Sequence, residues 1–205
     1  MTYYFKAPFL PPEKIKKEAD IFLDKYHPTR NPPIPIEYIA ESKLRMEIVP
    51  IPNLRTRTGI ESMLLSDLKT IVLDEYLLDI YSNGNRYRYS LAHEIAHLFL
   101  HREIVKEFGL NDTSALREFM TNVDSRQYGW LETHANEFAG LILVPPEVLE
   151  KSFKSVCSEL KKEGYSPSAD YSIFGEYLIE RLAKKFQVSP KVMEIRIRNE
   201  RLSME

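Results

Sequence analysis

The sequence predicts an α+β fold that is mainly helical and carries a small, roughly three-stranded sheet. Apolar residues recur at helical spacing in several long stretches, and three short β-prone runs follow one another within residues 46–73. The chain has 205 residues, of which 43% are hydrophobic and 28% are charged. This size and composition are typical of a globular domain with a real core. We therefore expect residues 1–205 to form a single domain.

The first helix is predicted from Pro12 to Tyr26. Proline suits the first position of a helix, and apolar residues then follow at helical spacing at Ile15, Ala19, Phe22 and Leu23. Four prolines between His27 and Pro35 predict an extended connection. A short helix is expected after it, from Ile36 to Ser42.

Three runs rich in β-branched and apolar residues predict the strands. They cover Met46 to Ile51, Glu61 to Leu65 and Thr70 to Leu73, and polar or glycine-containing breaks separate them. Runs this short and this close in the chain are typical of a small antiparallel sheet. We expect the sheet to pack against helices.

Two longer helices are predicted in the middle of the chain. The turn residues Asn83-Gly84-Asn85 are expected to cap the first, whose apolar side carries Tyr87, Leu91, Ile95, Leu98 and Phe99. The second is expected from Trp130 to Val144, with apolar residues at Leu131, Ala135, Phe138, Ala139 and Ile142. Pro145-Pro146 should end it sharply.

The remaining helices are predicted from prolines, caps and glycine. Pro146 can open a helix that stops near Gly164, and Asp170 to Phe186 reads as another. Ser189-Pro190 is a cap followed by a proline at the first helical position, which starts the last helix. A short helix is also expected from Asp112 to Val123, capped by Asp112 or Asn111.

The strongest chemical pattern is His93-Glu94-Ile95-Ala96-His97. On a helix, residues four apart lie on one face, so His93 and His97 could bind a single metal ion. Glu94 would then reach the water bound to that ion. This is the HExxH motif of zinc hydrolases, and it predicts that the helix beginning near residue 86 carries a metal site.

A catalytic zinc site needs a third protein ligand and one open position. The candidates lie on the predicted helix after Trp130 and are Glu132, His134 and Glu137. Glu132 and His134 are two residues apart and point to nearly opposite sides of a helix, so only one of them can face the metal. Glu132 lies on the flank of the apolar stripe, where it could reach a partly buried site, and Asn136 could hydrogen-bond to a ligand.

The chain resembles the ImmA/IrrE metallo-endopeptidases. The resemblance rests on Ile34-Pro-Ile-Glu-Tyr-Ile-Ala40, Tyr89-Ser-Leu-Ala-His-Glu-Ile-Ala-His97, Glu132-Thr-His-Ala-Asn-Glu-Phe-Ala139 followed by Leu141-Ile-Leu-Val-Pro145, and Phe186-Gln-Val-Ser189. It covers roughly residues 30–202. It implies a zincin-like metallopeptidase domain of the gluzincin type, with His93, His97 and Glu132 as the zinc ligands.

The implied reaction is zinc-dependent hydrolysis of a peptide bond in a protein. Zinc lowers the pKa of its water, and Glu94, the catalytic residue, takes the proton and passes it to the leaving amine. The resemblance further implies a protein substrate, in particular a helix-turn-helix transcriptional repressor whose loss releases stress-response or mobile-element genes. The donor to the oxyanion is left open among Tyr87, Tyr89, Arg126 and Tyr128.

Two further histidines near the motifs have alternative interpretations. His134 could replace Glu132 as the third ligand, or it could be a structural histidine. His101 continues the spacing of four from His97, but a histidine near a helix C-terminus is favoured by the helix dipole in any case. A site with three side chains and an open water position also has no room for it, so we expect it not to be a ligand.

Charge and cysteine content bear on partners and location. The formal net charge of −2 gives no general attraction to nucleic acid or to anionic membranes. The single cysteine, Cys157, excludes an intramolecular disulfide and favours a reducing compartment. No run of apolar residues is long enough for a membrane span, and the first residues do not resemble an export signal. We expect a soluble, cytoplasmic protein without a membrane partner.

The alternative function is that of a catalytically silent metal-binding protein or a DNA-binding regulator. The segment from Leu182 to Arg198 has the order of a helix, a short turn and a basic helix, as in DNA-reading motifs. The basic residues that could contact phosphates are Lys191, Arg196 and Arg198 in this segment and Arg201 just after it. Glu194 and Glu200 interrupt this positive face, which speaks against DNA binding.

Overall fold

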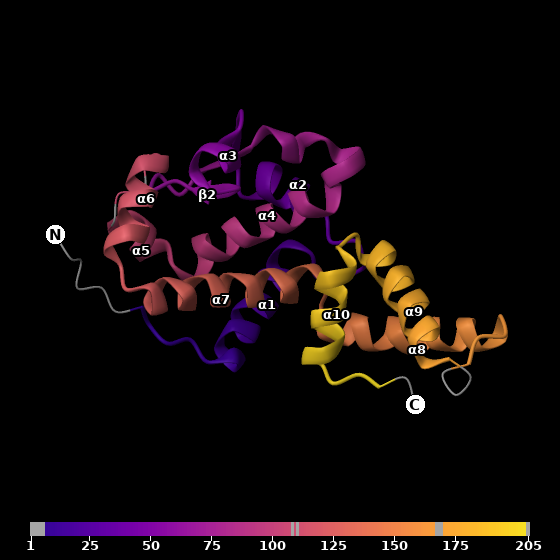
Figure 1. The fold of residues 1–205 in the computed structure, drawn as a ribbon. Helices are drawn as coiled ribbons and strands as arrows, with labels where there is room; N and C mark the ends of the chain where they lie inside the picture. The colour runs from indigo at the N-terminus through magenta and orange to yellow at the C-terminus, as the bar shows by residue number, and fades with distance from the viewer. Residues whose placement is uncertain (1–6, 108, 110, 167–169, 204–205) are drawn as a thin grey trace.

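The computed structural model describes residues 7–107, 109, 111–166 and 170–203 (Figure 1). Residues 1–6, which begin the stretch considered above for an export signal, lie outside the described residues. The fold is mainly helical with a small sheet, which confirms the predicted α+β class. No helix among the described residues has the length and apolar character needed to cross a bilayer.

The helices α4 (Ile80–Leu100) and α7 (Ser125–Leu143) pack against each other and form the centre of the molecule (Figure 1). The first helix, α1 (Pro12–Tyr26), has the predicted bounds and packs against both. Phe22 of α1 is fully buried and contacts Phe99 of α4 and Phe138 of α7 edge to face, with ring centroids 5.2 and 5.9 Å apart. Such aromatic contacts bury large apolar areas and fix how the three helices sit.

The sheet contains β1 (Glu47–Ile51), β2 (Ser62–Leu64) and β3 (Thr70–Asp74) in the order β1-β3-β2. The prediction of an antiparallel sheet was wrong, because β1 runs parallel to β3 and only β2 runs antiparallel to it. The central position of β3 follows from its sequence, since four of its five residues are buried. Pro50 has no backbone N–H to donate to a neighbouring strand, so β1 is suited to an edge of the sheet. The other edge strand is β2.

Two elements of the first half differ from the prediction: one is divided into two helical types, and one begins earlier. The short helix after the proline-rich connection is divided into α2 (Ile36–Tyr38) and the π-helical turn η1 (Ile39–Lys43). The expected turn at Asn83-Gly84-Asn85 was wrong, because α4 begins at Ile80 and runs through it. Asn85 donates a hydrogen bond to the carbonyl of Val188, 3.1 Å away, so a tertiary contact outweighs the local turn preference.

Arg88 anchors α4 to two distant parts of the chain. Its buried guanidinium donates to both carboxylate oxygens of Glu37, at 2.9 and 2.6 Å, and to the carbonyl of Ile34, at 2.6 Å. Its Nε donates to the carbonyl of Gln187, 3.2 Å away. The helix that carries His93 and His97 is therefore fixed to the proline-rich connection and to the C-terminal part of the chain.

The C-terminal helices α8 (Pro146–Lys162), α9 (Tyr171–Phe186) and α10 (Pro190–Asn199) lie together at one end of the molecule (Figure 1). Their starts follow the predicted signals: Pro146 is the first residue of α8, and Asp170 and Ser189 cap α9 and α10. Gly140 of α7 lets α10 approach closely, because a Cβ there would lie 3.1 Å from the Cδ of Arg196.

Several short helices complete the described chain. Of these, α6 (Thr113–Asn122) was predicted, and the Asp112 carboxylate caps it by accepting from the amides of Ser114 and Ala115. The helices α3 (Leu54–Thr58), η2 (Glu75–Leu78) and α5 (Arg102–Glu107) were not predicted. The long helix α7 begins at Ser125, earlier than expected, because Asp124 caps it through the amides of residues 126 and 127.

Candidate active site

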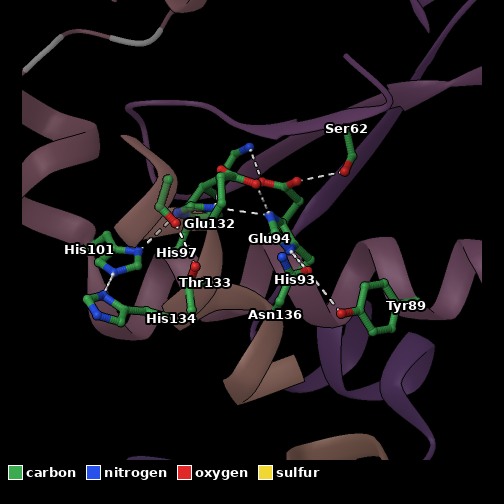
Figure 2. Close-up of polar contacts among 12 residues, drawn as sticks. Ser62, Tyr89, His93, Glu94, His97, His101, Glu132, Thr133, His134 and Asn136 are labelled. Carbon is green, nitrogen blue, oxygen red and sulfur yellow. Dashed lines mark hydrogen bonds and ion pairs between the residues drawn. The ribbon is translucent and has the colours of Figure 1, made fainter. Parts of the chain in front are cut away.

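The predicted ligand residues come together where α4 and α7 cross (Figure 2). His93 and His97 lie one turn apart on α4, and Glu132 reaches them from α7. One ligand atom from each of the three residues lies within 4.8 Å of the others. Among the described residues, this is the group of side chains that could hold a metal ion, and it contains neither His134 nor Glu137.

The distances within this cluster fit a small divalent metal ion. The two Nε2 atoms of His93 and His97 are 3.1 Å apart. Glu132 places Oε2 3.3 Å from the Nε2 of His93 and Oε1 3.5 Å from the Nε2 of His97. Ligands held tetrahedrally at about 2.0–2.1 Å from a metal lie about 3.3 Å from one another. Two imidazoles and one carboxylate with this spacing therefore suit one ion and leave a coordination position open.

The histidines and the glutamate of the cluster shift one another's pKa values. Burial alone would lower the pKa of His93, but the hydrogen bond with Glu132 and the charge of Glu94 raise it to about 8. Burial alone would raise the pKa of Glu132, but the hydrogen bonds with His93 and His97 hold it well below its usual range. The site thus favours a positive charge between the two helices, the place that a metal cation would take.

Glu94 is oriented by the edge strand β2. Its side chain is buried, and Oε1 accepts a hydrogen bond from the Ser62 hydroxyl at 2.6 Å (Figure 2). Oε2 accepts from the backbone amide of Leu64 at 2.8 Å. Because Glu94 follows His93 by one residue, it faces the strand while remaining in the same cavity as the histidines. The motif alone gave no sign of Ser62, which lies 32 residues before Glu94.

Asn136 contacts the outer side of His93, as predicted from its place on α7. Its Oδ1 lies 3.2 Å from the Nδ1 of His93 and accepts a hydrogen bond from the Tyr89 hydroxyl at 2.9 Å. A carbonyl oxygen can only accept, so Nδ1 of the His93 ring carries a proton. The Nε2 of His93 faces Oε2 of Glu132 at 3.3 Å, and it would supply its lone pair once a metal ion took the place of the proton between them.

The two other histidines lie behind the cluster. The Nδ1 of His101 is 3.1 Å from the Nδ1 of His97, and the Nε2 of His101 is 3.4 Å from the Nδ1 of His134. Both His101 and His134 are buried. Burial and the neighbouring His97 and His134 lower the pKa of His101 to about 2, so its ring is neutral. His134 therefore contacts a histidine instead of the cluster, and Glu137 lies 3.8 Å from Arg196 on the far side of α7.

A cavity of about 290 Å³ surrounds the cluster. One side is formed by β2 and the turn before it, and the other by α4, α5 and α7. Its apolar lining includes Ile60, Met63, Leu64, Ile104, Val105 and Leu131. Among the four candidate oxyanion donors, Tyr89 and Tyr128 line this cavity, whereas Tyr87 and Arg126 are not among its lining residues.

Both cavity tyrosines remain protonated at neutral pH. Burial, with the charges of Glu137 and Glu132, raises the pKa of Tyr89 to about 12. Burial and Glu132 raise the pKa of Tyr128 well above its usual range. Both hydroxyl groups carry a proton, but each already has a partner: Tyr89 donates to Asn136, and Tyr128 hydrogen-bonds with Glu132. Either tyrosine would have to leave that partner to donate to a substrate oxygen.

The basic residues of the C-terminal helix are arranged differently from those of a DNA-reading helix. Arg196 is buried, and its guanidinium donates to Glu200 at 2.6 Å and to the carbonyl of Val144 at 3.4 Å. Lys191 forms an ion pair with Glu194 at 3.0 Å. Of the four residues expected to contact phosphates, Arg196 is therefore buried and Lys191 is paired with a carboxylate.

The family model of the IrrE N-terminal-like domain, peptidase M78, matches residues 69–198 of the chain. This match covers more than half of the 205 residues and includes the cluster, Glu94 and the C-terminal helices. Ser62 and the rest of β2 lie outside it. None of the curated proteins compared with the chain matches it.

Proposed function

The chain belongs to the IrrE N-terminal-like family of peptidases, and on that premise we propose that it is a zinc-dependent metallo-endopeptidase. His93, His97 and Glu132 are the proposed ligands, and Glu94 is the proposed catalytic residue. The observation that carries the proposal is the set of ligand-atom separations of 3.1, 3.3 and 3.5 Å, with a buried carboxylate in the same cavity. A third ligand of this kind, with the fourth position open, is typical of catalytic zinc sites.

Zinc would supply Lewis acidity, which activates water near neutral pH and polarises the carbonyl of the scissile bond. The ligand set supports zinc because imidazole and carboxylate groups in a tetrahedral arrangement suit this ion. Asn136 supports the assignment of His93, because it holds a proton on Nδ1 and so makes Nε2 the nitrogen that would bind the metal.

Glu94 would accept the proton of the attacking water and return it to the leaving amine. Ser62 and Leu64 hold both oxygens of its carboxylate, so little reorientation is needed before proton transfer. The developing negative charge on the substrate carbonyl needs a donor, and the protonated Tyr89 and Tyr128 are the candidates that line the cavity. The contacts favour neither one over the other.

The proposed substrate is a protein, in particular a helix-turn-helix transcriptional repressor cleaved in the cytoplasm. Family resemblance supports the repressor, and the single cysteine supports the location. We also propose that residues 1–205 act as a single domain, because Arg88 and Arg196 tie the C-terminal helices to the helices of the site. A repressor encoded beside the gene would be the test substrate, to be cleaved by the wild type and left intact by Glu94→Gln.

Zinc content and peptide hydrolysis together test the proposal. After exposure to zinc and desalting, the wild type should hold near one zinc per chain and cleave a mixture of internally quenched peptides. Glu132→Ala should lose the zinc, whereas His134→Ala should keep it, because His134 contributes no atom to the cluster. A wild type without zinc would contradict the metal site. Zinc binding without any cleavage would instead favour the catalytically silent alternative.

A further inference from the structure

His93 and His97 differ in what their Nδ1 atoms contact, the ring nitrogens that face away from Glu132. The Nδ1 of His93 faces the carbonyl oxygen of Asn136 at 3.2 Å. The Nδ1 of His97 faces another ring nitrogen, the Nδ1 of His101, at 3.1 Å. A carbonyl oxygen accepts in every state, but an imidazole nitrogen accepts only in one of its two neutral tautomers. The orientation of His97 for metal binding therefore depends on the tautomer of His101.

The contacts of His97 and His101 determine that tautomer. The Nε2 of His97 faces Glu132 and the Nε2 of His93, so it must carry the lone pair when a metal is bound. The proton of His97 then lies on Nδ1 and points at the Nδ1 of His101. Consequently His101 accepts at Nδ1 and carries its own proton on Nε2, from which it donates to the Nδ1 of His134, 3.4 Å away.

We propose that His101 is a positioning residue for the metal site, and that the chain His97, His101, His134 fixes the tautomer of His97 with its Nε2 free for the metal. The inference rests on the proposed metal site. His101 and His134 are buried at 2% and 3% exposure, so both contacts are shielded from bulk water. Partners of this kind orient a metal-bound histidine and raise its basicity.

A neutral acceptor also suits the charge of this site. Two neutral imidazoles, Glu132 and Glu94 balance one divalent cation, whereas a carboxylate in place of His101 would add an uncompensated negative charge. Burying such a charge is costly. Around His101 the cavity lining is apolar, with Ile104, Val105 and Leu131. An imidazole can accept a hydrogen bond from His97 there without introducing a charge.

The test compares two substitutions that separate hydrogen bonding from packing. His101→Asn keeps an acceptor, Oδ1, at the place of Nδ1 but removes part of the ring. His101→Leu fills the buried space with an apolar side chain but cannot accept. If His101 served packing alone, the Leu variant would resemble the wild type more closely than the Asn variant does. The proposal predicts the opposite order for zinc affinity.

The dissociation constant for zinc is measured by competition with a chelator on the full chain. His101→Leu should weaken zinc binding about 10- to 100-fold, the usual effect of losing such a partner, whereas His101→Asn should stay within about threefold of the wild type. His27→Leu is the control, because it removes a histidine that lies outside the cavity lining. Unfolding of the metal-free variants, followed by circular dichroism, shows whether each one folds.

A second measurement does not depend on any variant. In wild-type protein loaded with zinc and labelled with ¹⁵N at histidine, long-range ¹H–¹⁵N spectra report which ring nitrogen carries the proton. The proposal requires the proton on Nδ1 of His97 and on Nε2 of His101. A proton on Nδ1 of His101 would overturn it, as would equal zinc affinity of His101→Leu and the wild type. A wild type that binds no zinc would instead overturn the proposed function, and the inference with it.

Discussion

The Ser62 hydroxyl donates a hydrogen bond of 2.6 Å to Oε1 of Glu94, so the edge strand β2 orients the carboxylate that α4 carries. The backbone amide of Leu64, two residues further along the strand, donates to Oε2 at 2.8 Å. The two donors come from one strand and hold both oxygens of one carboxylate. The HExxH helix thus supplies the proposed base, and the sheet determines where that base points.

Ser62→Ala is expected to lower the turnover number while leaving zinc content unchanged. A hydrogen bond to a charged group contributes about 1.5–3 kcal/mol, so losing one that aligns the base should lower kcat about 10-fold or more. Peptide hydrolysis and zinc content measured on one preparation check this. The control is Ser66→Ala, because the Ser66 hydroxyl donates to Asn111 and not to Glu94. An unchanged kcat would show that the Leu64 amide alone suffices.

Glu94→Gln is expected to abolish hydrolysis without disturbing the fold or the metal. Removing a general base usually costs about 10²- to 10⁴-fold in rate. Glutamine fits the same contacts, because its Oε1 can accept from the Leu64 amide and its Nε2 can donate to the Ser62 hydroxyl. Zinc content and the unfolding temperature should therefore match the wild type. Residual hydrolysis at more than a tenth of the wild-type rate would contradict the role of Glu94.

The sequence predicted the parts of the site that depend on local spacing. His93 and His97 share a helix face because they are four residues apart, and the second motif brought Glu132 into consideration from another helix. The structure gathers these three residues as expected. The elements marked by prolines and capping residues, such as α1 and α8, were also predicted with accurate bounds, because these signals act within a few residues of the helix end.

The sequence could not predict contacts between distant segments. Ser62 belongs to no motif, and its relation to Glu94 exists only because β2 lies beside α4. The contact between His101 and His134 joins residues 33 positions apart and requires the crossing of α4 and α7. The parallel pairing of β1 with β3 was missed for the same reason, because the order of strands depends on which one the helices bury.

Asp67 is expected to stabilise the hairpin between β2 and β3 in a pH-dependent manner. Burial would raise the pKa of Asp67, but hydrogen bonds from the Thr70 hydroxyl and the amides of Lys69 and Thr70 lower it. A lowered pKa means that the carboxylate contributes stability above the unfolded value of about 4, and that this contribution is lost as the pH falls through the lower folded value.

The substitution Asp67→Asn tests this pH dependence. Asparagine keeps one acceptor for the amides of Lys69 and Thr70 and removes the charge. Its amide nitrogen replaces the oxygen that accepts from the Thr70 hydroxyl, which would have to turn and accept instead. Because Asp67 is exposed, the loss in unfolding free energy at pH 7 should be below about 1 kcal/mol. Thermal unfolding of the metal-free protein should show a gap between variant and wild type above pH 5 that closes toward pH 2. A gap that widened on acidification would have the wrong sign.

Arg196 is expected to stabilise the docking of α10 on α7 instead of binding nucleic acid. Its side chain is 3% exposed and donates to Glu200 and to the carbonyl of Val144. Arg196→Met keeps most of the volume and removes these hydrogen bonds. A cost of about 2 kcal/mol would follow, which for a chain of this size lowers the unfolding temperature by about 4–8 °C.

Arg198 provides the matched control, because it lies on the same helix but is exposed. Arg198→Met should leave the unfolding temperature unchanged, since surface substitutions rarely cost more than about 0.5 kcal/mol. If α10 contacted phosphates, the exposed Arg198 would be the residue whose loss weakens binding, and the affinity would fall steeply with salt. We expect no salt-dependent retardation of duplex DNA by the wild type. Retardation that Arg198→Met abolished would restore the DNA-binding alternative, because the exposed Arg198 would then contact phosphates although Arg196 is buried.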